Sequence, residues 1–213
     1  MMTDKKEPTS EFFNDAFKEI GNIGAGHAAT ALSQMLNRRI DISVPRLTII
    51  KLQDKLDPLY DSLPIKKDAN LGIVYTMTSG DLEVDLLTVI PETGIIKFLN
   101  LVTYSKVTDV LALTEFEKSS LKEIGNILLL HYISAMNVFI SSRLFIYPRV
   151  PEIALGSTIE VIETVFDKYL TEHDKEILSI DVDILVDEDK IDTSMLLVPS
   201  KETLENITAI FFG

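Results

Sequence analysis

Two pairs of side chains stand out, because each combines a carboxylate with an amide at the same spacing. Glu19 and Asn22 form the first pair, and Glu123 and Asn126 form the second. A spacing of three residues places the two members of a pair on one face of a helix, about one turn apart. The carboxylate supplies a negative charge, and the amide both donates and accepts hydrogen bonds. Each pair could therefore contact a polar or charged group outside its helix.

The two pairs belong to an internal repeat. The segment Lys-Glu-Ile-Gly-Asn-Ile occurs twice, with Glu19 and Glu123 separated by 104 residues. The same offset aligns His27 with His131, Ala31 with Ala135 and Arg39 with Arg143. A single such pair is most simply a solvent-facing pair on a helix surface. Its retention in two otherwise diverged copies favours a function, because neither residue belongs to the apolar stripe that packs in the core.

Composition limits the class of protein. With 213 residues, of which 46% are hydrophobic, the chain has enough apolar material for one sizeable core, and a disordered chain is excluded. A formal net charge of −13 argues against binding to nucleic acid or anionic membrane. The absence of cysteine excludes disulfides and thiolate metal sites. We expect a cytoplasmic protein without membrane insertion, because no signal peptide or apolar run of about 20 residues is present.

Hydrophobic periodicity predicts the elements of the first half. A loose polar tail precedes a helix that begins near Ser10 and ends near residue 38. Glycines inside this helix indicate close approach, by a neighbouring helix at Gly24 and by a partner at Gly26. Pro45 marks an edge or bend of the strand that follows. The other predicted elements are extended segments 40–44 and 47–52, a polar loop 54–70 with a short helix, a hairpin of 71–78 with 82–90, and a helix 91–102.

The second half repeats this order of elements. A helix capped at Thr114 is predicted to end near residue 142. Extended segments are predicted at 144–150, 157–165, 176–185 and 194–198, followed by a last helix after Pro199 and Ser200. The chain is therefore predicted to be an α+β protein with two pseudo-symmetric α-β-β-β-α halves, about 10–110 and 114–213. The halves share one mostly antiparallel sheet within a single domain, 1–213, and two long helices carry the sites.

Other chemical interpretations have weaker support. The segment from Gly21 to Gly26 does not have the spacing of a phosphate-binding loop, and no strand precedes it. His27 and His131 each lack a second ligand at the spacing of a known metal motif, so a core or interface histidine is the better interpretation. No nucleophile-elbow signature indicates a serine hydrolase. We expect neither a metal site nor a cofactor of the protein's own.

One combination of residues resembles a known family. Asp15, Glu19, Asn22 and Pro45 match the D/S-x3-E-x2-N-x22-P pattern of the CheC, CheX and FliY chemotaxis phosphatases. The following Gly-Ala-Gly-His-Ala-Ala-Thr-Ala-Leu-Ser is similar to the CheC version. The resemblance covers nearly the whole chain, because CheC-like proteins have this length and two such sites, without the additional C-terminal domain of FliY.

The second copy departs from this pattern. Ser119, Glu123 and Asn126 match it, but Arg149, flanked by Pro148 and Pro151, occupies the position of the proline. Leu130 and Ile133 replace Gly26 and Ala29, the residues at which a partner is expected to approach the first site. We therefore expect a remodelled second site, with a shifted strand or a more apolar partner contact.

The resemblance implies hydrolysis of the aspartyl phosphate on a CheY-type response regulator. It implies that Asn22 and Asn126 orient the attacking water, and that Glu19 and Glu123 pair with a lysine of the regulator. The Mg2+ ion would belong to the regulator, and Asp15 and Ser119 would be helix-start or interface residues. The alternative is a non-catalytic adaptor that binds a receiver domain or a CheD-type deamidase through the same faces.

Overall fold

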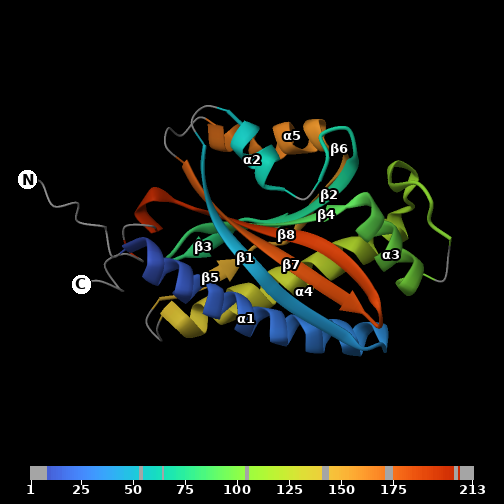
Figure 1. Cartoon of the computed structure of the whole chain (residues 1–213), viewed down its shortest axis with the longest axis horizontal. Coiled ribbons are helices and arrows are strands. Elements are labelled where there is room, and N and C mark those ends of the chain that lie inside the picture. Colours follow the sequence, from blue (N-terminus) through green and yellow to red (C-terminus); the bar gives the residue numbers. More distant parts are fainter. Residues whose placement is uncertain are drawn as a thin grey trace, which may run out of the picture.

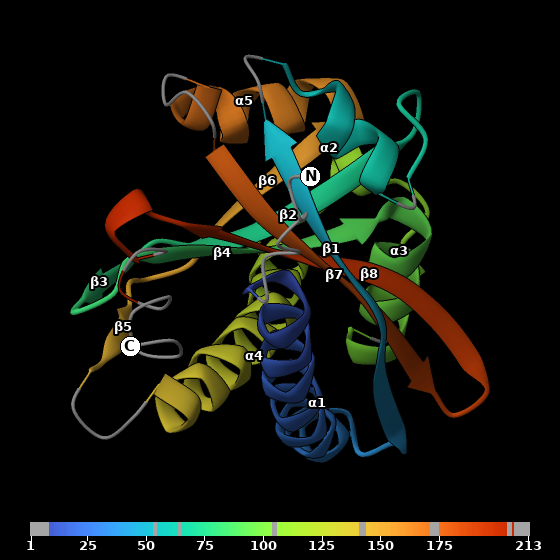
Figure 2. The same cartoon turned by 60° about the vertical axis from the view of Figure 1, so that its left-hand side comes forward.

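A six-stranded antiparallel sheet separates two layers of helices in the computed structural model of the protein (Figures 1 and 2). The structure describes residues 9–52, 55–63, 65–103, 106–140, 144–170, 175–203 and 206. The long helices α1 and α4 cover one face of the sheet, and the shorter helices α2 and α5 cover the other. In these ranges, no helix is long and apolar enough to cross a lipid bilayer.

The elements follow one another in an order that nearly repeats. The helices are α1 (Thr9–Leu36), α2 (Asp57–Ser62), α3 (Glu92–Val102), the 3-10 helix η1 (Val110–Ala112), α4 (Glu115–Ile140) and α5 (Thr158–Leu170). The strands are β1 (Ile40–Leu52), β2 (Asn70–Thr76), β3 (Thr78–Gly80), β4 (Val84–Pro91), β5 (Ile146–Pro148), β6 (Glu152–Ser157), β7 (Lys175–Val186) and β8 (Asp189–Pro199). The predicted mixed fold with a mostly antiparallel sheet and two long helices is confirmed.

The strand order of the sheet is symmetric with respect to the two halves of the chain. The order is β1-β7-β8-β4-β2-β6, so each half places one strand at an edge, one next to the opposite edge and one at the centre. The edge strand β1 pairs with β7 of the second half, and the edge strand β6 pairs with β2 of the first. At the centre, β4 pairs with β8. Within the described residues, the edge strand of each half therefore pairs only with a strand of the other half.

Two expectations for the second half are wrong. Residues 157–165 were expected to be extended, but α5 begins at Thr158. Its buried side chains, Val161, Ile162, Val165 and Phe166, follow helical spacing and cover the sheet. The expected segment 144–150 is also interrupted, because β5 ends at Pro148 and pairs with β3 outside the main sheet. Each half therefore contains an additional helix between its first and second strands.

The predicted cap of the second long helix is confirmed. The Glu117 N–H donates to the Thr114 hydroxyl at 3.3 Å, and the Thr114 N–H donates to the Glu117 carboxylate at 2.8 Å. This reciprocal pair satisfies donors that the first turn of a helix leaves free. The side chain of Ser10, the expected start of α1, lies outside the described residues. Residues 201–203 are helical, as predicted after Ser200, and most of the expected last helix lies outside the described residues.

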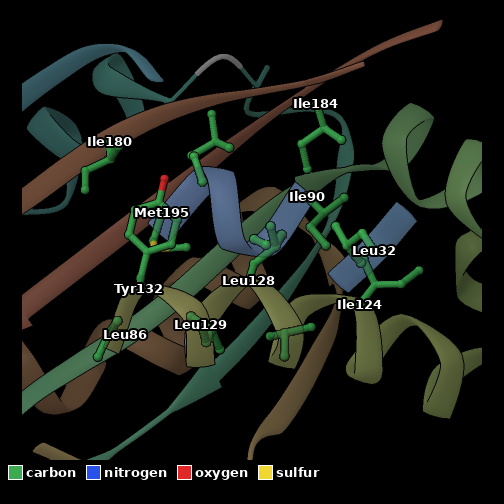
Figure 3. Packing of buried hydrophobic residues seen from close by; sticks show 14 of the residues in the cluster. Leu32, Leu86, Ile90, Ile124, Leu128, Leu129, Tyr132, Ile180, Ile184 and Met195 are labelled. Atoms are coloured by element: carbon green, nitrogen blue, oxygen red, sulfur yellow. The ribbon is translucent and has the colours of Figure 1, made fainter. Parts of the chain in front are cut away.

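The main hydrophobic core lies between the sheet and the three helices α1, α3 and α4. Figure 3 shows Leu128 and Tyr132 of α4 gathered with sheet residues such as Met195. A second cluster fills the space between the sheet and helices α2 and α5. Both faces of the sheet are therefore buried, which explains why β2, β4 and β8 are apolar along most of their length rather than strictly alternating.

Glycines allow the closest contacts of the two long helices. A β-carbon on Gly24 would lie 3.2 Å from Cα of Tyr132, so α1 and α4 touch nearly backbone to backbone. This confirms the prediction of a neighbouring helix at Gly24. A β-carbon on Gly125 would lie only 2.5 Å from Cβ of Val74, so α4 also approaches β2 closely. Side-chain rotation cannot relieve a clash between two β-carbons.

Repeat-related histidines meet where α1 and α4 pack together. The ring centroids of His27 and His131 are 6.2 Å apart, in an edge-to-face arrangement. Burial, and secondly the nearby His27, lower the pKa of His131 below its usual value. Although the fold brings the two rings together, the described residues include no group of three or more side chains arranged to hold a metal ion.

The glycine contacts predict opposite effects for two matched substitutions. Gly125→Ala should lower the free energy of unfolding by about 1–3 kcal/mol, because the added methyl overpacks the contact with Val74. Gly26→Ala should raise it by up to about 1 kcal/mol, because alanine favours the helix and its β-carbon meets nothing within 4 Å. Urea denaturation measures both changes. Equal stability of the two variants would contradict the close helix–sheet contact.

The histidine pair predicts a specific pH dependence. In the folded protein the NMR titration midpoint of His131 should lie below 6.5, the ordinary histidine value. Because the unfolded chain takes up this proton more readily, stability should fall as the pH drops from about 6.5 to the folded midpoint. His27→Gln should raise the midpoint only partly, since burial remains. An unchanged or lower midpoint in this variant would contradict the assigned coupling.

Candidate functional site

The first carboxylate–amide pair lies on the outer face of α1. Glu19 and Asn22 are exposed, whereas the neighbouring Phe17 and Ile20 are buried against the core. The helical period therefore turns the polar pair away from the sheet. In this register the two side chains project from the helix into solvent, where a partner can reach them.

The second pair lies at the equivalent positions of α4. Glu123 is exposed and Asn126 is half-buried, while Ile124 between them is fully buried. Ser119 is exposed one turn before Glu123. Asn126 is less accessible than Asn22 because α4 packs directly against the sheet, with α1 and α3 as its neighbours.

The amides of the two pairs differ from those of structural asparagines. Asn137, on the same sector of α4, donates to the Ile146 carbonyl at 3.1 Å and accepts from the Ile146 N–H at 2.8 Å. The Asn100 side chain likewise donates to the Val107 carbonyl and accepts from the Val107 N–H. By contrast, Glu19, Asn22, Glu123 and Asn126 make no hydrogen bond or ion pair with any other described residue. Their polar atoms therefore remain available to a partner.

The proline of the sequence pattern lies at an irregularity of the edge strand. Pairing of β1 with β7 shifts register between Ser43 and Arg46, and Pro45 lies inside this bulge. The expected edge or bend is confirmed. In the second copy the strand is interrupted, with Arg149 between β5 and β6. Asp15 lies within α1, but its side chain and that of Pro45 lie outside the described part of the structure.

The four residues expected to face a partner are not equivalent. Gly26 is exposed about one turn beyond Asn22, and Ala29 is half-buried about two turns beyond it. Leu130 is exposed by 40%, so its side chain is accessible from solvent. The expectation for Ile133 is wrong, because this side chain is only 3% exposed. Strand β5 packs against the C-terminal part of α4 and encloses it in the core.

A groove beside the first pair was not predicted from the sequence. This α1–β1 groove has a volume of about 500 Å³. It is lined by Gly26, Ala29, Thr30, Ser33 and Gln34 of α1 and by Ile40, Asp41 and Ile42 of β1. Small residues at positions 26, 29, 30 and 33 are a sequence signal for it, but the signal becomes specific only when β1 is known to lie alongside the helix.

Comparisons with known proteins agree with this arrangement. A family model described as the CheC-like family matches residues 14–49, which include the first pair and Pro45. The CheY-P phosphatase CheC of Bacillus subtilis (strain 168) is 32% identical over 143 residues, or 66% of this chain and 65% of that protein. The chain thus covers slightly less than two thirds of this relative.

Solved structures share the fold over most of the chain. FliY of Thermotoga maritima has a TM-score of 0.73 at 18% identity, covering 93% of this chain and 94% of the other. CheX of Borrelia burgdorferi, solved in a complex with CheY, BeF3 and Mg2+, has a TM-score of 0.50 at 13% identity, covering 88% and 97%. The family model and the related sequence show that the chain is similar to CheC-like proteins, and the solved structure of FliY shows that it shares their fold.

Proposed function

We propose that the protein hydrolyses the aspartyl phosphate of a CheY-type response regulator at two sites, one on α1 and one on α4. The observation that carries this proposal is the repeated Glu-x-x-Asn pair, which faces outward in both copies with its polar atoms unused by the described chain. The relative named as a CheY-P phosphatase supports the same reaction.

The proposed division of roles follows from the chemistry of phosphoryl transfer. Transfer to water requires an in-line nucleophile and stabilisation of charge, more than covalent help from the enzyme. The amide of Asn22 or Asn126 would lie beside the phosphate and orient the attacking water, since it can donate and accept at once. Glu19 or Glu123 would pair with a lysine of the regulator and hold the docked geometry.

The Mg2+ ion of the reaction is assigned to the regulator. It would neutralise charge on the phosphate oxygens while the phosphatase contributes the amide and the carboxylate. A fold relative, CheX, was solved together with CheY, BeF3 and Mg2+, which supports this assignment. In this scheme the phosphatase requires no metal ligands or cofactor of its own.

An exposed helix face suits a phosphate that is itself carried by a protein. An aspartyl phosphate is part of another protein's surface, so the catalytic side chain must project from the enzyme to reach it. Side chains on the outer face of a rigid helix project in this way. Gly26 and Ala29 leave room beside Asn22. Because the halves exchange edge strands, we propose that residues 1–213 act as one CheC-like domain that holds both sites in a fixed relation.

The phosphatase proposal predicts how the lifetime of the phosphorylated regulator changes. With Mg2+ present, the wild-type protein should shorten this lifetime, and each of Asn22→Ala and Asn126→Ala should remove the contribution of one site. The double variant should lower the hydrolysis rate by about 10²-fold or to the regulator's own rate, because the water is no longer oriented. Loss of radiolabelled phosphate from the regulator measures the rates.

A matched control separates this effect from general damage to the helix. Asn137→Ala removes another asparagine of α4, one that bonds to β5, and should affect stability rather than turnover. Full activity of the double variant would exclude the proposed role of the amides. Binding of the phosphorylated regulator without faster hydrolysis by the wild type would favour the adaptor interpretation, with a receiver domain or a CheD-type deamidase as partner.

The docking role of the glutamates predicts a change in KM rather than kcat. Measured in the Asn126→Ala background, Glu19→Gln should raise KM about tenfold or more, because one charge-assisted hydrogen bond across the interface is lost. The difference should shrink as salt is added. Glu160→Gln removes an exposed carboxylate from α5, on the opposite face of the sheet, and is the control. A lower kcat at unchanged KM would assign Glu19 to the chemical step instead.

A further inference from the structure

The α1–β1 groove is continuous with the first site. Gly26, which lines it, follows Asn22 by four residues, or roughly 6 Å along the helix axis. A β-carbon at Gly26 would meet nothing within 4 Å, so the groove is open at the end nearest the amide. A protein docked over Glu19 and Asn22 would therefore also cover this end of the groove.

The lining of the groove favours an apolar side chain. The Thr30 hydroxyl donates to the Gly26 carbonyl of its own helix at 3.0 Å, and the Ser33 hydroxyl donates to the Arg38 carbonyl. Asp41 is held by Arg39 at 2.9 Å. The hydroxyl protons and the carboxylate are thus already engaged within the chain. Ala29, Ile40 and Ile42, which are buried or half-buried, supply apolar surface.

The corresponding positions of the second site carry larger apolar side chains. By the offset of 104 residues, Gly26 corresponds to Leu130, Gln34 to Val138 and Asp41 to Phe145. These three apolar side chains are exposed by 40%, 75% and 43%, respectively. Asn137, the counterpart of Ser33, holds β5 against α4 through both of its hydrogen bonds to Ile146. Where the first site is hollow and rimmed by polar groups, the second presents apolar side chains.

We infer that the two sites select different receiver surfaces, with residues 26 and 130 as the determinants. The first site accepts an apolar side chain that projects from the receiver beside its phosphorylated aspartate and enters the α1–β1 groove. The second site inserts Leu130 into an apolar depression of the receiver. This inference rests on the proposed function, because it assigns the partner surface to the same two sites.

The contrast between the two sites comes from the residues that differ between the two copies of the repeat. Both copies keep the glutamate and the asparagine, while the position one turn further along differs by a whole leucine side chain. A receiver that protrudes at this point fits beside Gly26 and collides with Leu130. Selection by such a clash discriminates between partners without altering the groups proposed for chemistry.

The test exchanges the two determinants while only one site is active. In the Asn126→Ala background, Gly26→Leu should raise KM for a phosphorylated CheY-type regulator at least about tenfold with kcat nearly unchanged, and Gly26→Ala should have a smaller effect. In the Asn22→Ala background, Leu130→Ala should raise KM instead. Thr164→Leu adds a leucine to an exposed position of α5 on the other face of the sheet, and should change neither.

Binding of the regulator activated with beryllofluoride, measured by calorimetry in the same variants, separates the two proposals. If the wild type binds without hydrolysing, and Gly26→Leu weakens that binding, the phosphatase proposal fails and the inference on recognition holds. If hydrolysis proceeds and Gly26→Leu and Leu130→Ala leave KM and binding unchanged in their backgrounds, the inference fails alone. The inference also fails if Gly26→Leu changes KM equally in the Asn126→Ala and Asn22→Ala backgrounds, and Leu130→Ala does the same. Absence of binding by the wild type overturns both.

Discussion

The contact between α1 and α4 constrains the rest of the molecule. Gly24 lets the backbone of α1 approach Tyr132, whose ring fills the space between the helices and the sheet. In the repeat, Tyr132 corresponds to Ala28 and Leu128 to Gly24, so α1 contributes the small residues and α4 the large ones. Because both apolar stripes are used in this contact and against the sheet, each Glu-x-x-Asn pair can only face outward.

The exchanged edge strands make the two copies of the repeat depend on each other. β1 needs β7 as its hydrogen-bonding partner, and β6 needs β2. Such pairing joins segments from different halves of the chain, which couples the stability of one half to the presence of the other. It also accounts for the difference between the long helices. α4 lies over the sheet and buries part of Asn126, while α1 rests on α4 and the edge strand β1 and leaves Asn22 open.

Local patterns were sufficient to predict the features that depend on local physics. The long helices, the cap at Thr114, the β2–β4 hairpin and the outward position of Glu19 and Asn22 all follow from helical or strand periodicity. The segment beginning at Thr158 was assigned wrongly because its β-branched residues alternate with polar ones at first, and only burial against the sheet selects the helix. The strand exchange, the burial of Ile133 and the α1–β1 groove depend on pairings distant in sequence, which periodicity cannot show.

The different environments of the two pairs are consistent with the chemistry proposed for them. If the regulator supplies the acyl phosphate and the Mg2+ ion, the phosphatase must retain only an amide for the water and a carboxylate for docking. The remaining surface is then free to diverge, provided that the helices still pack. The structure meets this condition, because the residues that differ most between the sites, such as Gly26 and Leu130, lie on the outer face and not in the α1–α4 contact. Duplication of such a unit can therefore preserve one reaction while it separates two modes of recognition.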